Sequence, residues 1–92
     1  MTRYRILSWN VNGLRAVAGK EVIEGARFPE FLLSDRPDIC CLQETKVDAK
    51  SLPPDLGRIG EYFFYLNPAI RKGYSGTGLY TLREPVEISF GL

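Results

Sequence analysis

Short apolar runs bounded by polar and turn residues recur along this chain, and such runs are typical of β-strands. Arg5–Trp9 is the first run and Asp38–Leu42 is the second. We predict three later strands at Tyr62–Leu66, Thr77–Leu82 and Val86–Phe90. In the last of these, apolar and polar residues alternate, which predicts a strand with one buried face.

Helical spacing occurs between the first two predicted strands. Leu14–Gly25 carries apolar residues at loosely helical intervals, interrupted by Gly19, and predicts a short helix. A second helix is predicted from Phe28 to about Asp35, because Pro37 disfavours helical geometry at the residue before it. Ser51–Asp55 predicts a turn followed by one helical turn. A strand, helices, a strand and then a run of strands together predict an α+β fold, in which helices are layered on a sheet.

The composition sets limits on the kinds of partner and compartment. The 92 residues allow one domain, and a hydrophobic fraction of 45% with a formal net charge of +1 is typical of an ordinary soluble domain. No general cationic field attracts polyanions, although a local basic rim would suffice for DNA. No apolar run reaches the ~20 residues of a membrane span, and the N-terminus enters a strand without a signal peptide, so we expect a cytoplasmic protein. The only cysteines, Cys40 and Cys41, are strand neighbours that face opposite ways, so we expect two reduced thiols.

Two of the predicted strands end in residues suited to binding a metal ion. Glu44 follows the second strand, and a carboxylate is a hard oxygen ligand for Mg²⁺. Asn10 follows the first strand, and its side chain would meet Glu44 if the two strands lie side by side. The alternatives are a surface carboxylate paired with Lys46, and an asparagine that caps the next turn.

Two cationic segments are candidates for contacts with phosphate. Arg15 follows a glycine turn, and a guanidinium is suited to a bidentate phosphate contact, although a solvated arginine is the alternative. Arg71–Gly76 combines two cations, two glycines and a tyrosine. Glycine lets backbone N–H groups approach a phosphate, and an aromatic ring stacks on nucleotides. An ordinary hairpin turn is the alternative for this loop.

Three motifs together resemble exonuclease III-type apurinic/apyrimidinic (AP) endonucleases of the endonuclease/exonuclease/phosphatase superfamily. They are Trp9–Arg15 (Trp-Asn-Val-Asn-Gly-Leu-Arg), Gln43–Lys46 and Gly73–Gly76, and the resemblance runs from about Ile6 to Leu92. It implies a DNase I-like sandwich of two sheets with flanking helices. Residues 1–92 would then be the N-terminal part of that domain, supplying the first sheet and leaving the fold incomplete.

The resemblance also implies roles for individual residues. Glu44 would be the essential metal-binding glutamate, Asn10 would contribute through its amide oxygen or a bridging water, and Asn12 would lie close to the metal. The metal would be Mg²⁺, with Mn²⁺ as a substitute. Lys46 would support Glu44 or touch the substrate. DNA contacts would come from Arg15 with the adjacent Ala16, and from Gly73, Tyr74, Ser75 and Gly76.

The implied activity is Mg²⁺-dependent hydrolysis of DNA on the 5′ side of abasic sites in base-excision repair, with 3′→5′ exonuclease action. The partners would be double-stranded DNA with abasic sites or 3′ ends, and the rest of the chain's own domain. The chain has no histidine. The family's later segments, which supply that histidine and a water-activating aspartate with its neighbouring asparagine, do not occur here. We therefore expect the 92 residues alone to be inert. The alternatives are another phosphoesterase of the superfamily, such as a phosphatase, and a non-catalytic remnant that binds nucleic acid weakly.

Overall fold

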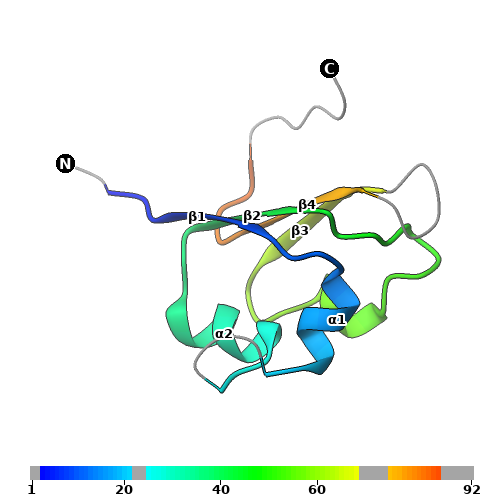
Figure 1. Cartoon of the computed structure of the whole chain (residues 1–92). Coiled ribbons are helices and arrows are strands. Elements are labelled where there is room, and N and C mark those ends of the chain that lie inside the picture. The colour runs from blue at the N-terminus through cyan, green and yellow to red at the C-terminus, as the bar shows by residue number, and fades with distance from the viewer. Residues whose placement is uncertain (1–2, 22–24, 69–74, 86–92) are drawn as a thin grey trace.

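A four-stranded mixed sheet forms the centre of the computed structural model, which describes residues 3–21, 25–68 and 75–85. The strands are β1 (Ile6–Asn10), β2 (Ile39–Gln43), β3 (Phe63–Asn67) and β4 (Thr77–Thr81), in the spatial order β1-β2-β4-β3 (Figure 1). β1 and β2 are parallel, and the other two pairings are antiparallel. The predicted α+β class and four of the five predicted strands are confirmed. The fifth, Val86–Phe90, lies outside the described residues.

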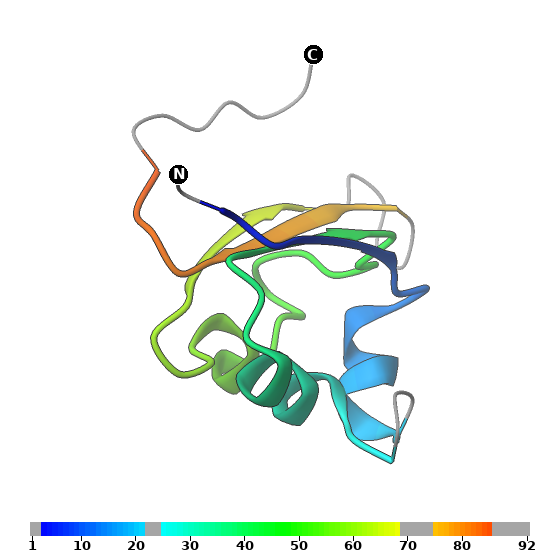
Figure 2. The same cartoon turned by 90° about the vertical axis from the view of Figure 1, so that its left-hand side faces the viewer.

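The helices all lie on one face of this sheet, as two perpendicular views show (Figures 1 and 2). They are α1 (Leu14–Gly19), α2 (Phe28–Asp35) and the 3₁₀ turn η1 (Pro54–Gly57). Two parallel strands need a long crossover between them, and α1 and α2 form the described part of that crossover. The single helical turn predicted after the Ser51–Asp55 segment is η1.

α2 has the predicted bounds, whereas α1 is shorter than predicted. α2 ends at Asp35, where Arg36 takes a left-handed φ of 52° and donates its N–H to the Leu32 carbonyl at 3.0 Å. α1 was predicted to continue to Gly25 but ends at Gly19, because Lys20 is extended. Glycine has low helix propensity, since it loses more backbone entropy than other residues.

The core lies between the helices and the inner face of the sheet. Tyr80 of β4 is at its centre, wholly buried, with its ring 5.5 Å from that of Phe28 and 4.4 Å from that of Phe64. Its hydroxyl donates to the Leu56 carbonyl at 2.5 Å, so the one polar atom of this side chain is satisfied. The other buried apolar residues include Leu14, Val17, Leu32, Cys40, Leu42, Val47, Ile59 and Tyr62.

The outer face of the sheet carries no helix among the described residues (Figure 2). Strand register places Ile6, Ile39, Thr81 and Phe63 in one row there. Ile6 and Phe63 are 65% and 41% exposed, whereas Thr81 is buried. Leu79 also lies on this outer face, opposite Cys41 and Tyr65. The row at the carboxyl end of β1 and β2 is polar, and consists of Asn10, Gln43, Thr77 and Asn67.

Within the described residues, no helix is long and apolar enough to cross a membrane.

Candidate metal site and its surroundings

Asn10 and Glu44 meet at the carboxyl ends of β1 and β2. The parallel register pairs Asn10 with Gln43, the last residue of β2. Glu44 follows directly after this strand. The Asn10 Nδ2 atom donates a hydrogen bond to Glu44 Oε2 at 2.5 Å. The predicted convergence of the two side chains is thus present in the structure, while their role in binding a metal stays a prediction.

The Glu44 carboxylate is exposed, although its backbone is firmly held. Gly13 N donates to the Glu44 carbonyl at 2.8 Å, and Leu14 N donates to the Thr45 carbonyl at 2.9 Å. Thr45 is wholly buried, whereas Glu44 has a left-handed φ of 54° and extends into solvent. The structure thus fixes the backbone of Glu44 and leaves its side chain accessible.

Asn12 and Lys46 complete this cluster. Lys46 Nζ donates to Asn12 Oδ1, and the Asn12 backbone N–H donates to Asn10 Oδ1 at 3.1 Å. Lys46 therefore contacts Asn12 rather than Glu44. We call Asn10, Asn12, Glu44 and Lys46 the strand-end cluster.

The oxygen atoms of this cluster fit half of a magnesium site. Mg²⁺ keeps several waters and takes one or two carboxylates together with substrate phosphate oxygens. Glu44 supplies one carboxylate, and no described residue donates a hydrogen bond to its Oε1 atom. No group of three or more histidine, cysteine, aspartate or glutamate side chains gathers in the described part of the chain. A complete site would therefore need further oxygen ligands.

The end of the predicted DNA-binding loop adjoins the cluster. Lys46 N donates to the Ser75 carbonyl at 2.7 Å, and Thr45 N donates to the Gly76 carbonyl at 3.1 Å. Ser75 is exposed and takes a left-handed φ of 47°. The predicted contact residues Gly73 and Tyr74 lie outside the described residues.

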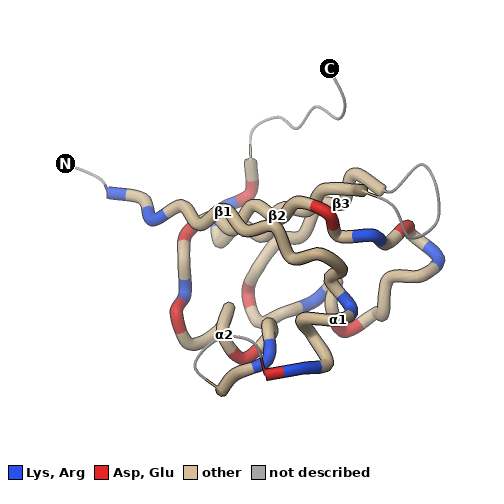
Figure 3. The backbone as a smooth tube through the Cα atoms, in the orientation of Figure 1, with Lys and Arg blue, Asp and Glu red and all other residues tan. Residues whose placement is uncertain are grey.

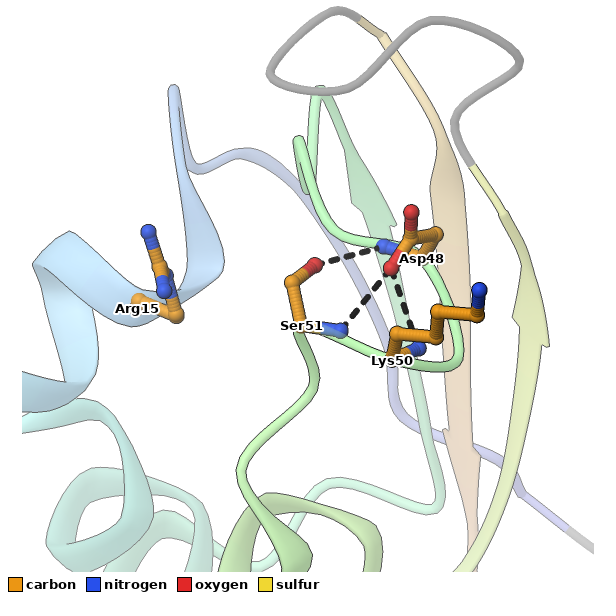
Figure 4. Close-up of a pocket in the computed structure, with 4 residues that line it drawn as sticks. All are labelled: Arg15, Asp48, Lys50 and Ser51. Carbon is orange, nitrogen blue, oxygen red and sulfur yellow. Dashed lines mark hydrogen bonds between the residues drawn. The ribbon is translucent and has the colours of Figure 1, made fainter.

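Arg15 and Ala16 lie exposed in the first turn of α1. Arg15 flanks a cavity of about 380 Å³ opposite the Asp48–Ser51 turn (Figure 4). Neither Arg15 nor Lys50 makes a side-chain hydrogen bond or ion pair with another described residue. Arg15 and Lys50 bring two positive charges to the lining of this cavity, and Asp48 brings one negative charge.

The Asp48–Ser51 turn, on the other side of this cavity, was not predicted from the sequence. Asp48 Oδ1 accepts hydrogen bonds from Lys50 N at 3.0 Å and from Ser51 N at 2.8 Å. The Ser51 hydrogen bonds hold the pKa of the Asp48 carboxyl below its ordinary value. The Asp-x-x-Ser spacing was the available signal, because such side chains bond to local backbone.

Charge elsewhere is dispersed. Basic and acidic positions are interspersed along the described chain rather than gathered on one face (Figure 3). The described residues therefore form no single basic face.

Comparisons with known proteins agree on one family. The model of the endonuclease/exonuclease/phosphatase family matches residues 7–91. An exodeoxyribonuclease of Bacillus subtilis is 40% identical over 90 residues, which cover 96% of this chain and 32% of the relative. The chain thus spans about a third of that protein's length.

Two solved structures have the same arrangement of strands and helices. An AP endonuclease from Archaeoglobus fulgidus superposes with a TM-score of 0.79 at 30% identity, covering 98% of this chain and 32% of the other. A 3′ phosphatase from Neisseria, bound to a product DNA hairpin, gives a TM-score of 0.77 at 26% identity with the same coverage.

Proposed function

Because this chain belongs to the endonuclease/exonuclease/phosphatase family, we propose that it is the N-terminal part of an exonuclease III-like nuclease acting on DNA. The proposed reaction is hydrolysis of the phosphodiester bond on the 5′ side of an abasic site during base-excision repair, with 3′→5′ exonuclease action. The observation that carries the proposal is the meeting of Asn10 and Glu44 at the ends of two parallel strands. The name and 40% identity of the bacterial exodeoxyribonuclease support it.

Glu44 is the proposed metal ligand of this part of the enzyme. Nucleases of the family generally use divalent metal ions, and we propose Mg²⁺ with Mn²⁺ as a substitute. When bound, such an ion polarises the scissile phosphate and stabilises the leaving 3′ oxygen. Asn10 holds one carboxylate oxygen of Glu44 and leaves the other for the cation. The amide oxygen of Asn10 accepts the Asn12 N–H, and Asn10 would contribute to the site through that oxygen or through a bridging water.

The proposed DNA contacts lie on either side of the strand-end cluster. Arg15, with Ala16 beside it, contacts the DNA backbone, and the cavity of about 380 Å³ that Arg15 borders has room for a phosphate group. The loop that includes Gly73, Tyr74, Ser75 and Gly76 contacts DNA on the other side. In support, Ser75 and Gly76 are hydrogen-bonded to the backbone of Lys46 and Thr45.

By the resemblance, the residues that activate water come from later segments of the family's proteins. Hydrolysis needs a positioned nucleophile as well as stabilisation of charge in the transition state. The 92 residues include no histidine, and we propose that the remaining two thirds of the enzyme provide the acid–base groups.

A second candidate function is removal of a 3′ phosphate from DNA. The structural similarity to the Neisseria 3′ phosphatase favours it, and the same metal half-site would serve both reactions. A phosphatase for other substrates and a non-catalytic remnant remain the alternatives from the sequence.

Replacing Glu44 tests the proposal in the full-length enzyme that carries this chain. Glu44→Gln removes the charged ligand, so we expect incision of an abasic duplex at limiting Mg²⁺ to fall about a hundredfold or more. The matched control is Glu61→Gln, which alters an exposed carboxylate paired with Arg36 and should retain activity.

Three substrates distinguish the candidates: an abasic duplex, a duplex with a 3′ phosphate, and an inositol phosphate. Cleavage of the inositol phosphate alone would refute action on DNA. Equal activity of the Glu44→Gln variant and the wild type would refute the metal role.

A further inference from the structure

The strand-end cluster orients the Asn10 amide. Lys46 Nζ donates to Asn12 Oδ1, the Asn12 backbone N–H donates to Asn10 Oδ1, and Asn10 Nδ2 donates to Glu44 Oε2. An asparagine amide has one accepting end and one donating end. Because the oxygen of Asn10 is occupied by Asn12, its amino group faces the carboxylate. The reversed amide would place an oxygen against Glu44, where two acceptors would repel each other.

The loops around the cluster maintain this orientation at a conformational cost. Asn12, Glu44 and Lys46 have φ angles of 47°, 54° and 57°, in the left-handed region that side chains usually avoid. Backbone bonds from Gly13 N to the Glu44 carbonyl and from Lys46 N to the Ser75 carbonyl hold this geometry, at 2.8 and 2.7 Å. These three residues belong to one hydrogen-bonded chain that runs from Lys46 through Asn12 and Asn10 to Glu44.

We propose that Lys46 and Asn12 are positioning residues for the metal half-site. Lys46 holds Asn12, and Asn12 holds Asn10 with its amino group toward Glu44. One carboxylate oxygen is thereby fixed, and Oε1 remains for a divalent cation. The inference rests on the proposed function and assigns Asn12 to orientation rather than to metal ligation.

The sign of the effect on metal affinity separates positioning from simple electrostatics. Lys46 is cationic, so its removal would strengthen the binding of another cation if the lysine acted only through its field. If it positions Glu44, its removal weakens binding. A lysine that touches only DNA would change substrate affinity and leave metal affinity unchanged.

The experiment measures Mn²⁺ affinity by electron paramagnetic resonance in the full-length enzyme without DNA. We expect Lys46→Ala and Asn12→Ala each to weaken Mn²⁺ binding about tenfold, the usual cost of losing a partner of a metal ligand. The double variant should be no weaker than either single variant, because both changes break the same hydrogen bond. Lys46→Arg and Asn12→Asp retain a donor and an acceptor and should restore affinity. Lys20→Ala, at an exposed lysine beyond α1, is the matched control.

A second measurement does not depend on the metal. The Asn10 side-chain NH₂ signal in a ¹⁵N NMR spectrum should shift and exchange faster with water in Lys46→Ala, while the thermal unfolding midpoint stays near that of the wild type.

An unchanged Asn10 signal would overturn the inference. Additive losses of Mn²⁺ affinity in the double variant, or strengthened Mn²⁺ binding in either single variant, would also overturn it. If Glu44→Gln abolishes Mn²⁺ binding while Lys46→Ala does not weaken it, the inference fails and the proposed function stands. If the wild type binds no Mn²⁺, the proposed function fails. The positioning role is then tested only by whether the Asn10 NMR signal changes in Lys46→Ala.

Discussion

Backbone strain in this protein is concentrated in a few residues at the strand ends. Five non-glycine residues in the described part of the chain have positive φ angles, and four of them are Asn12, Glu44, Lys46 and Ser75. Such conformations cost of order 1–3 kcal/mol each and persist where surrounding contacts determine them. Here the contacts come from buried Thr45 and the backbone bonds on both sides of it. The strain therefore coincides with the candidate site rather than with ordinary turns.

Replacing the single residue Arg15 tests the proposed DNA contact. In the full-length enzyme, Arg15→Gln should weaken DNA binding similarly for all sequences and lower the slope of log K against log[salt] by about 1, because one phosphate contact is lost. Fluorescence anisotropy with a short duplex at several salt concentrations measures this. Arg58→Gln, at an exposed arginine beyond η1, is the control. If both variants bind DNA as tightly as the wild type, Arg15 is only a solvated side chain.

Among the elements, β2 has one face toward the core and the other toward the outer side of the sheet. Cys40 faces the core and is wholly buried, while Cys41 faces the outer side of the sheet. Burial, with smaller contributions from Cys41 and Asp35, raises the pKa of the Cys40 thiol from 9.0 to about 12. The unfolded thiol ionises first, so this group's stabilising contribution is complete below pH 9.0 and is lost as the pH rises toward about 12.

The two thiols should therefore react at different rates. In the 92-residue chain at pH 8, in which the outer face of the sheet is accessible, we expect a maleimide to label Cys41 much faster than Cys40, because only an accessible thiolate is nucleophilic. Cys40→Ala and Cys41→Ala each leave one thiol, and mass spectrometry follows its labelling. In denaturant the two rates should become similar. Faster labelling of Cys40 in the native state would contradict the assigned faces of β2.

At the scale of the whole molecule, the outer face of the sheet carries no helix among the described residues. Ile6 and Phe63 are exposed there, at 65% and 41%. The Bacillus subtilis exodeoxyribonuclease is about three times as long as this chain, and the sequence resemblance predicts a second sheet against this face. Exposed apolar patches and unpaired strand edges promote association.

The 92 residues by themselves should associate and fail to incise DNA. We expect light scattering to detect oligomers at micromolar concentration, and calorimetry to show no sharp monomeric transition. Phe63→Ser should reduce association, whereas Leu33→Ser, at a residue 47% exposed on the helical side, should not. A stable monomer would refute the predicted instability. Incision of an abasic duplex that depends on Glu44 would show that some residue here replaces the missing acid–base groups.

Local sequence determined most of the elements and the family. Pro37 fixed the end of α2, and the polar residues after two apolar runs identified Asn10 and Glu44, because strand ends and proline geometry act over a few residues. The three motifs carried the resemblance that the family model confirms. The length of α1 was overestimated, since side-chain spacing does not report the backbone freedom of Gly19.

Only the tertiary structure decided how the site is arranged. The parallel register of β1 and β2 brings residues 34 positions apart into contact, as in the Asn10–Glu44 and Lys46–Asn12 bonds. The exposure of Glu44 follows from a left-handed φ maintained by neighbouring loops. The orientation of the Asn10 amide depends on Asn12, and the cavity beside Arg15 depends on the Asp48–Ser51 turn. These features arise from contacts between segments distant in sequence, which no local pattern of residues encodes.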